Sequence, residues 1–510
     1  MASIIRNPFV SKNVQSTYWL TRFMMLRLLG AIYVIAFWVA INQLLPLVGS
    51  NGLTPVGIFL SQVRQSLGPG ASAFWKLPTL FWFNHSDTSL LIAAWSGLVL
   101  AILVLLGYAN SIVMGLLWLL YLSIVHVGQD WYGYGWEIQI LEIGFLSVFL
   151  CPLLDGRPFP KTPTPLPIIV LFRWLTFRIM LGAGLIKLRS DQIWKNGTAL
   201  YYHFETQPLP GPLSRWFHFF PKFVLKVGTW FNWLAELVAP WFLFWPRMTR
   251  NWAAAIIILF QLTLILSGNL SFFNWLTILP ALACFDDKAW SSVLPAGLIR
   301  RANKAEAEAS PSPTHQITSW AATALIVILS FRPALNLLSS SQIMNASYDS
   351  FDLVNTYGAF GTVDTVRYNV IFEGTLDSDS SNSHWIPYIY KGLPVSCAQR
   401  PPQIAPYQLH LDWQMWFASM STPQEYPWTL HLIYKLLHND PGAIGMFSKN
   451  PFPKQPPRYI RAELYRYSFA PPGNSKGLWW NREKLGDWIP PLSANDPRLI
   501  NFLKSEDWYP

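Results

Sequence analysis

The sequence predicts a polytopic α-helical membrane protein with a C-terminal α+β, β-rich domain outside the membrane. Hydrophobic residues make up 52% of the 510 residues and charged residues only 13%, whereas charged residues average about 25% in soluble domains. Aromatic residues, which favour membrane interfaces, reach 16%. Long apolar runs recur up to about residue 344, where the composition changes. We therefore expect a membrane domain over residues 1–344 and an extramembrane domain over residues 345–510.

About nine transmembrane helices are expected, because a crossing needs roughly 20 apolar residues. The fourth and eighth runs are short, and the eighth contains Pro280, so a count of eight or ten is also open. The nine runs are residues 28–48, 89–107, 111–127, 136–153, 165–188, 224–245, 252–267, 270–285 and 317–338.

The distribution of basic residues predicts the orientation, because Lys and Arg accumulate in short cytoplasmic loops. With the N-terminus in the cytosol, the cytosolic segments carry most of them, including Arg6, Lys12, Arg300 and Arg301. An odd number of spans then places the C-terminal domain outside the cell or in a lumen. This topology and anionic lipid headgroups explain the net charge of +10. Membrane lipids are therefore expected partners, and no motif indicates nucleic acid.

Four Asn-x-Ser/Thr sequons occur, at Asn84, Asn196, Asn269 and Asn345. All four fall on the outer side in the predicted topology, where N-glycosylation takes place. The motif is short and arises often by chance, so it supports the topology weakly. We expect Asn269 to lie too close to the membrane for modification.

Six charged residues stand inside apolar runs, where each would cost roughly 2.5–3.5 kcal/mol on insertion scales. Three are basic and lie on the fifth run, and three are acidic and lie on two other runs. We expect them to neutralise one another between helices or to line a polar cavity. They are Arg173, Arg178, Lys187, Glu137, Glu142 and Glu236.

Lys187 lies at the outer end of the fifth run beside Gly182, Ala183 and Gly184, small residues that allow close helix packing. A lysine desolvated in such a site could act as a catalytic base. The alternative is that its ammonium group snorkels to the membrane interface. Glu142, and likewise Glu236, is expected to pair with an arginine of the fifth run, with acid catalysis by Glu142 as the alternative.

The loop over residues 189–221 is rich in aromatic residues, His and Pro, and suits an interfacial or re-entrant plug at the outer face. Tyr202, Glu205 and Gln207 are candidate binding residues of this loop. His203 and Glu205 could form a proton relay or bind a metal. A single His/Glu pair without a second His is a weak metal signal, so we expect no metal and no cofactor.

The C-terminal domain is expected to combine strands and helices. Residues 362–376, 384–392 and 458–469 alternate in the manner of strands. Residues 409–420 and 427–440 are predicted helices, and the second ends at Asp440-Pro441-Gly442. Asp412, Trp413 and Trp416 on the first of these helices are either packing residues or candidate functional residues.

Several long motifs resemble the lipase maturation factor family, in order and over nearly the whole chain. They include STYWLTRF (16–23), WEIQILEIGFLSVFL (136–150), FRIMLGAGLIKLRSDQIW (177–194), YYHFETQPLPGPLS (201–214), NTYGAFGTV (355–363), APYQLHLDWQMWFASM (405–420) and WWNREKLGDWIPPLS (479–493).

The resemblance implies a chaperone-like protein of the endoplasmic reticulum membrane that helps secreted lipases fold, with a lumenal C-terminal region. In a prokaryote the membrane would be the plasma membrane. The family commonly has Arg where this chain has His410, and often Asp where it has Glu137. Both departures bear on client specificity more than on fold.

A second resemblance covers one helix and its following loop. The stretch AGLIKLRSDQIWKNGTAL (183–200) is similar to the vitamin K-dependent gamma-glutamyl carboxylase, in which the lysine matching Lys187 is the catalytic base. It implies an alternative function: an intramembrane enzyme acting on a lipid or quinone-like substrate. Lys187 would be its base, with Glu142 or His203 assisting.

Overall fold

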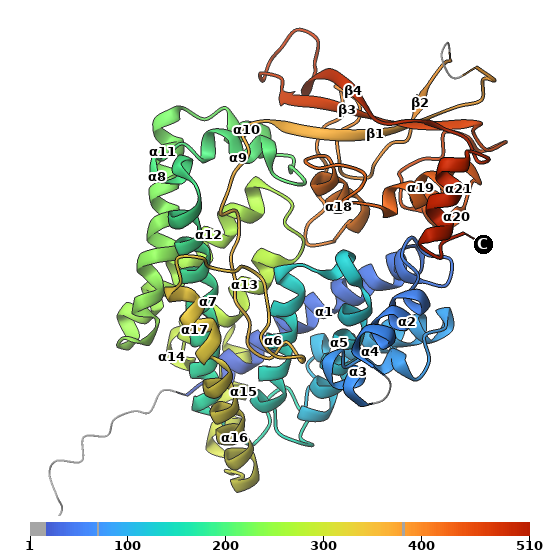
Figure 1. The fold of residues 1–510 in the computed structure, drawn as a ribbon. Coiled ribbons are helices and arrows are strands. Elements are labelled where there is room, and N and C mark those ends of the chain that lie inside the picture. The colour runs from blue at the N-terminus through green and yellow to red at the C-terminus, as the bar shows by residue number, and fades with distance from the viewer. Residues whose placement is uncertain (1–16, 69–70, 380–382, 510) are drawn as a thin grey trace, which may run out of the picture.

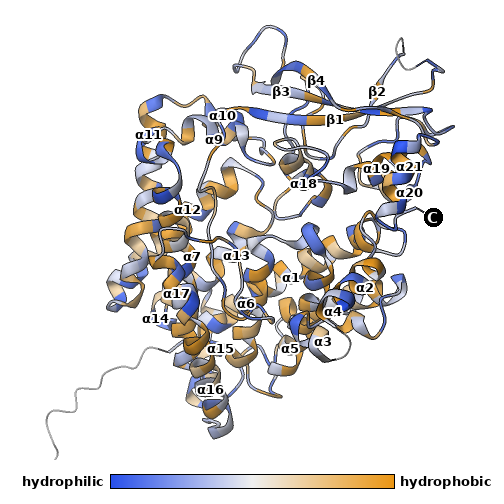
Figure 2. Ribbon diagram, in the orientation of Figure 1, coloured by the Kyte–Doolittle hydropathy of each residue, from blue (hydrophilic) through white to orange (hydrophobic). Residues whose placement is uncertain are grey.

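The computed structural model describes residues 17–68, 71–379 and 383–509. Its helices form one body, and a β-sheet lies above one end of that body (Figure 1). Hydrophobic residues dominate the helices, whereas hydrophilic residues are more frequent along the strands (Figure 2). Arg6 and Lys12, which contribute to the predicted orientation, lie outside the described residues.

The first part of the helical body is a bundle of consecutive helices. Helix α1 (Trp19–Val48) packs along α4 (Asp87–Leu106), which packs on α5 (Ser111–Val127), which in turn packs on α6 (Gly135–Leu150). The shorter elements α2 (Val56–Leu67), α3 (Ala71–Lys76), η1 (Leu80–Trp82) and η2 (Gln129–Tyr132) connect them.

Helix α7 (Leu166–Ser190) lies near the centre of the helical body and contacts α6. Around it lie α11 (Lys222–Trp233), a π-helical turn η3 (Leu234–Val238) and the 3-10 turn η4 (Ala239–Phe244). They are followed by α12 (Arg247–Ser267), α13 (Phe273–Ala281) with η5 (Leu282–Cys284), α14 (Asp287–Trp290), α15 (Ala296–Ala307), α16 (Pro313–Leu329) and α17 (Phe331–Leu338). Of these elements, helices α13, α16 and α17 and the turns η3, η4 and η5 contact α7.

Five helices of the described chain are long and apolar enough to cross a membrane, which confirms a polytopic membrane protein. They are Trp19–Val48, Asp87–Leu106, Leu166–Ser190, Arg247–Ser267 and Pro313–Leu338. Ser111–Val127 and Phe273–Cys284 are apolar but shorter. The count of nine stays a prediction. The first helix begins at Trp19, before the predicted span, and so includes Arg22, which is buried.

The C-terminal part contains an antiparallel sheet in the order β2-β1-β3-β4. Its strands are β1 (Arg367–Thr375), β2 (Ile386–Pro387), β3 (Tyr459–Phe469) and β4 (Trp480–Leu492). Helices α18 (His410–Ala418) and α19 (Trp428–Leu437) lie between the sheet and the helical body and contact β1 and β3, respectively (Figure 1).

Both long predicted strands and both predicted helices of this part are confirmed, with three corrections. The strand expected over residues 384–392 has only two residues. Asp440 does more than end a helix, because its side chain caps the next one, α20 (Pro441–Gly445), by accepting from Ala443 N at 2.8 Å. Strand β4 and helix α21 (Pro497–Ser505) were not predicted.

A long segment without regular structure joins α17 to β1 and runs back along the helical body (Figure 1). The loop between α7 and α11 folds into the short helices α8 (Gln192–Lys195), α9 (Leu200–Thr206) and α10 (Ser214–His218) at the same end as the sheet (Figure 1). The sheet, this loop and the ends of several apolar helices therefore meet in one region.

Close packing of α1 on α4 generates the first testable prediction. A Cβ added at Gly30 would lie 2.6 Å from the backbone nitrogen of Leu105, whereas a Cβ at Gly115 of α5 would meet nothing within 4 Å. We expect Gly30→Leu to lower the free energy of unfolding by about 1–3 kcal/mol, because the backbone of α4 must shift. Gly115→Leu is the matched control and should leave thermal unfolding in detergent unchanged; equal effects of both variants would contradict the packing.

Candidate functional site

A buried ion pair joins helices α6 and α7. The guanidinium of Arg178 on α7 pairs with the carboxylate of Glu142 on α6, and the two side chains are 2% and 0% exposed. This is the arginine partner that the sequence predicts for Glu142. Buried charges of this kind are stable only when they are paired and hydrogen-bonded.

The segment that precedes the sheet completes the hydrogen bonds of this pair. Glu142 Oε2 accepts from the backbone N–H of Asn355 at 3.1 Å and from the hydroxyl of Tyr357 at 2.8 Å. Arg178 Nη1 donates to the carbonyl oxygen of Asn355 at 2.6 Å. The same four groups thus hold two helices and the start of the C-terminal part together.

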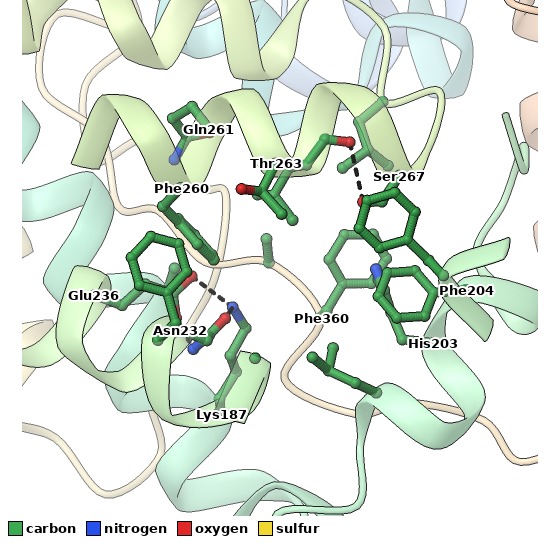
Figure 3. A pocket seen from close by; sticks show the side chains of 18 of the residues that line it. Lys187, His203, Phe204, Asn232, Glu236, Phe260, Gln261, Thr263, Ser267 and Phe360 are labelled. Atoms are coloured by element: carbon green, nitrogen blue, oxygen red, sulfur yellow. Dashed lines mark hydrogen bonds and ion pairs between the residues drawn. The ribbon is translucent and has the colours of Figure 1, made fainter. Parts of the chain in front are cut away.

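A second ion pair lies near the C-terminal end of α7, where Figure 3 shows Lys187 beside Glu236 and Asn232. Lys187 Nζ donates to Glu236 Oε1 at 2.5 Å and to Asn232 Oδ1 at 3.1 Å. Asn232 Nδ2 donates in turn to Glu236 Oε2 at 2.9 Å. Lys187 is 4% exposed, so it does not snorkel, and Glu236 pairs with a lysine and not with the expected arginine.

The π-helical turn positions Glu236 for this contact. Pro240 has no N–H to offer the carbonyl of Glu236, and its ring would clash with that carbonyl in a continuous α-helix. The helix widens to a π turn over Leu234–Val238 and continues as the 3-10 turn. Insertions of this kind are frequent at functional sites.

Mutual neutralisation of the six charges is incomplete, because Arg173 and Glu137 do not pair with each other. Arg173 donates to the carbonyl of Ala283 at 3.0 Å and to the hydroxyl of Tyr18 at 2.8 Å. Glu137 accepts from the hydroxyl of Tyr121. Because α6 and α7 run in opposite directions and Glu142 is level with Arg178, the other two residues are offset by about 15 Å along the helices.

A cavity of about 360 Å³ begins at the Lys187–Glu236 pair. It lies between α7, α9, α11 and α12 and is lined mainly by aromatic and aliphatic side chains (Figure 3). Its polar lining residues are Lys187, His203, Asn232, Glu236, Gln261, Thr263, Ser267 and Thr277.

His203 lies on the wall of this cavity, 5% exposed, with its ring 4.7 Å from that of Phe360. Burial, together with the nearby charge of Lys187, lowers the pKa of His203 to about 3, so the imidazole is neutral. Glu205 instead accepts from Phe469 N at 2.6 Å. The predicted relay between His203 and Glu205 is therefore not assembled.

The remaining candidates of the aromatic loop are packing and anchoring residues. Gln207 Nε2 donates to Ser267 O at 2.9 Å, and Trp416 Nε1 donates to Thr206 O at 2.9 Å. Tyr202 packs at the edge of a small cluster around Trp194. These contacts fasten α9 to α12 and to α18.

Asp412 and Trp413 hold α18 in place. Asp412 accepts from the backbone N–H groups of Gly392 and Leu393 at 2.6 and 3.0 Å, and burial raises its pKa to about 6. Trp413 meets Trp136 of α6 edge to face, with ring centroids 4.9 Å apart. Of the two roles that the sequence leaves open, packing or function, these contacts fit packing.

Sequence reasoning missed several residues that complete these sites. Asn232 stands four residues before Glu236 on an apolar helix, a spacing that brings two side chains together. Asn355 and Tyr357 belong to a motif quoted above, but nothing in it indicates a partner more than 200 residues away. Arg367 of β1 is 1% exposed and donates to the carbonyl oxygens of Gln207 and Pro208.

Across residues 17–68, 71–379 and 383–509, no group of three or more His, Cys, Asp or Glu residues is arranged to hold a metal ion. The arrangement offers instead two neutralised ion pairs, a neutral imidazole and an apolar cavity. These features suit the binding of apolar groups.

Comparisons with known proteins assign the family. Residues 20–292 match the lipase maturation factor transmembrane domain, and residues 353–490 match the lipase maturation factor C-terminal domain. The chain belongs to the lipase maturation factor family. The predicted boundary at residues 344 and 345 falls between the two matches and stays a prediction.

The similarity of this lipase maturation factor family member extends over most of the chain. It is 42% identical to Lipase maturation factor 1 of Bos taurus, covering 97% of this chain and 92% of that protein. It is 41% identical to Lipase maturation factor 1 of Homo sapiens, over 96% and 91%. Lipase maturation factor 2 of Homo sapiens is 27% identical, over 95% and 84%. No solved structure matches the chain.

The buried pair between α6 and α7 generates a prediction about stability. We expect Arg178→Met to lower the free energy of unfolding by about 3–5 kcal/mol, because the Glu142 carboxylate is left buried without its cation. The double variant Glu142→Met, Arg178→Met should recover part of this loss, since no uncompensated charge remains. Thermal unfolding in detergent measures both; a double variant less stable than Arg178→Met alone would contradict the pairing.

Proposed function

We propose that this protein is a membrane-anchored maturation factor for secreted lipases that acts in a chaperone-like manner. The observation that carries the proposal is the 41–42% identity, over nearly the whole chain, to proteins named Lipase maturation factor 1. Its partners would be membrane lipids and a secreted, lipase-like client. The membrane would be that of the endoplasmic reticulum in a eukaryote and the plasma membrane in a prokaryote.

The proposed topology has the N-terminus in the cytosol, nine spans and a lumenal or extracytoplasmic C-terminal part. Besides the five long helices, the four shorter crossings would be α5, α6, the α11–η4 segment and α13 with η5. In favour of this, the loop with α8–α10 and the sheet lie at one end of the helical body (Figure 1). The proposed domains are residues 1–344 and 345–510.

A client would meet the outer aromatic surface, which we define as Trp216, Phe219 and Phe220. These side chains are 47%, 39% and 43% exposed. Exposed apolar groups that gather on one surface are typical of sites that bind other apolar surfaces. Their position beside the sheet places them where a secreted protein would arrive in the proposed topology.

The carboxylase-like alternative is not favoured. All three relatives described above carry maturation factor names. Lys187 is held by Glu236 and Asn232, so its ammonium group is a hydrogen-bonded member of an ion pair. We therefore assign Lys187, Glu142 and His203 to the architecture of the helical body and propose no catalytic step for them.

A rescue experiment tests the client surface. In cells that lack the endogenous factor, we expect the wild-type chain to restore the activity of a co-expressed secreted lipase. Trp216→Ser combined with Phe220→Ser should reduce that activity about tenfold or more, because the client loses apolar contacts worth over 1 kcal/mol.

The control for this experiment is Trp252→Ser on α12, which removes another exposed aromatic side chain, 66% exposed, away from the outer aromatic surface. Its rescue should equal that of the wild type. If the wild-type chain restores no lipase activity, the proposed function is wrong. If the wild type restores it and the double surface variant does so equally, the function stands and the client site is wrong.

Glycosylation mapping tests the proposed topology. Asn84, Asn196 and Asn345 are exposed, whereas Asn269 is buried and hydrogen-bonded to Pro210 O and Pro402 O. In a eukaryotic host we expect a glycan on one or more of the three exposed asparagines and no glycan on Asn269. Each site is assayed with its own Asn→Gln variant and glycosidase treatment. A glycan on Asn269 would contradict the fold at that position, and a cytosolic epitope tag at the C-terminus would contradict the orientation.

A further inference from the structure

The cavity beside Lys187 opens toward an apolar surface of α11. Phe220 and Val227 both line the cavity and are 43% and 51% exposed, so they mark its mouth. Phe223, Val227 and Trp230 recur at helical spacing on α11, and all three are more than half exposed. A continuous exposed apolar stripe on a membrane protein is a surface that lipid covers. The mouth of the cavity therefore lies next to the acyl chains of the bilayer.

The inner end of the cavity is polar but carries no net charge. The charges of Lys187 and Glu236 cancel, and the imidazole of His203 is neutral. Two of the three N–H groups of Lys187 are used by Glu236 and Asn232. His203, which is 95% buried and lines the cavity, has no side-chain hydrogen-bond partner among the described residues. Buried polar groups normally have a hydrogen-bond partner, so the imidazole of His203 is free to bond to a ligand at this end of the cavity.

The size and lining restrict what can fill the cavity. A volume of about 360 Å³ is at the low end of sites for small molecules and cofactors. An anionic headgroup would be buried without a free cation, because Lys187 is already neutralised by Glu236. A hydroxyl or carbonyl oxygen would instead satisfy His203 without adding charge.

We propose that this cavity binds a bilayer amphiphile with one long apolar chain and an uncharged hydroxyl or carbonyl head, the head lying against His203 and Lys187. The chain lies along Phe204, Phe231 and Phe260 and leaves between Phe220 and Val227. This lipid site shares Phe220 with the outer aromatic surface, but it is distinct from the client site because its head-binding end lies inside the helical body and Val227 opens it to the stripe on α11.

Photoaffinity labelling of the full chain in nanodiscs tests the site. The probe is hexadecanol with a diazirine in its chain, and hexadecanoic acid with the same diazirine is compared with it. We expect the alcohol to label peptides of α11 or α12 and the acid to label them about tenfold less at neutral pH, because its carboxylate finds no free cation. Excess unlabelled hexadecanol should abolish the labelling of the wild-type chain.

Two variants locate the site, and one variant controls for bulk. Thr263 points from α12 toward the cavity (Figure 3), so Thr263→Trp should fill the cavity and reduce labelling about tenfold or more. His203→Phe keeps an aromatic ring but removes the polar partner, and it should reduce labelling about fivefold or more. Gly115→Trp adds the same bulk where a Cβ meets nothing within 4 Å and should label like the wild type.

Each outcome decides the proposal. Equal labelling by the alcohol and the acid, undiminished labelling of a folded Thr263→Trp protein, or failure of unlabelled alcohol to compete would overturn it. If Thr263→Trp does not fold, competition on the wild-type chain and the His203→Phe variant decide alone. Because the readout is probe attachment, a wild-type chain that is labelled but restores no lipase activity would contradict the proposed function and leave the lipid site intact.

Discussion

A charged group enclosed between helices must find every one of its partners within the protein, and this constraint shapes the molecule. Glu142 has no exposed surface. Its carboxylate is satisfied by Arg178 of the neighbouring helix and by groups of Asn355 and Tyr357. The latter two come from the segment that leads into the sheet. The helical body is thus complete only when the C-terminal part has docked on it.

The need for partners within the protein has a different consequence at the Lys187–Glu236 pair. Lys187 and Glu236 neutralise each other with the help of Asn232, and a π turn next to Pro240 brings the carboxylate into range. No part of the C-terminal sheet is needed there. The pair instead forms the uncharged end of a cavity, so one ion pair joins the two parts of the chain and the other prepares a space for an apolar ligand.

The sheet end of the molecule carries an exposed aromatic surface that fits the proposed function. The aromatic loop is fastened to the sheet side through Arg367 and Trp416, both of which donate to backbone carbonyls of that loop. Its exposed aromatic side chains are therefore held on a rigid base, which reduces the entropy lost when an apolar surface binds. Family membership and this surface support the same function.

The sequence was sufficient to predict much of this arrangement, because charge within apolar runs is a strong signal. It predicted the membrane class, the arginine partner of Glu142 and the strands β1 and β3. It did not predict that Glu137 would accept from Tyr121, or that Arg173 would donate to Tyr18 and the carbonyl of Ala283. The axial offset between two helices depends on where each helix begins and ends. Strand β4 was missed because charged residues and two prolines mask its alternation, which an edge strand tolerates.

The role of Glu142 in docking the segment around Asn355 is tested most directly by hydrogen exchange in detergent. In the wild-type protein the backbone amide of Asn355 should be protected, because it donates to Glu142. In Glu142→Gln it should exchange about tenfold faster or more, because a neutral amide oxygen replaces the charged acceptor and holds the N–H more weakly, while amides paired between β1 and β3 stay protected. An Asn355 amide that exchanges at the same rate in both proteins would contradict the account.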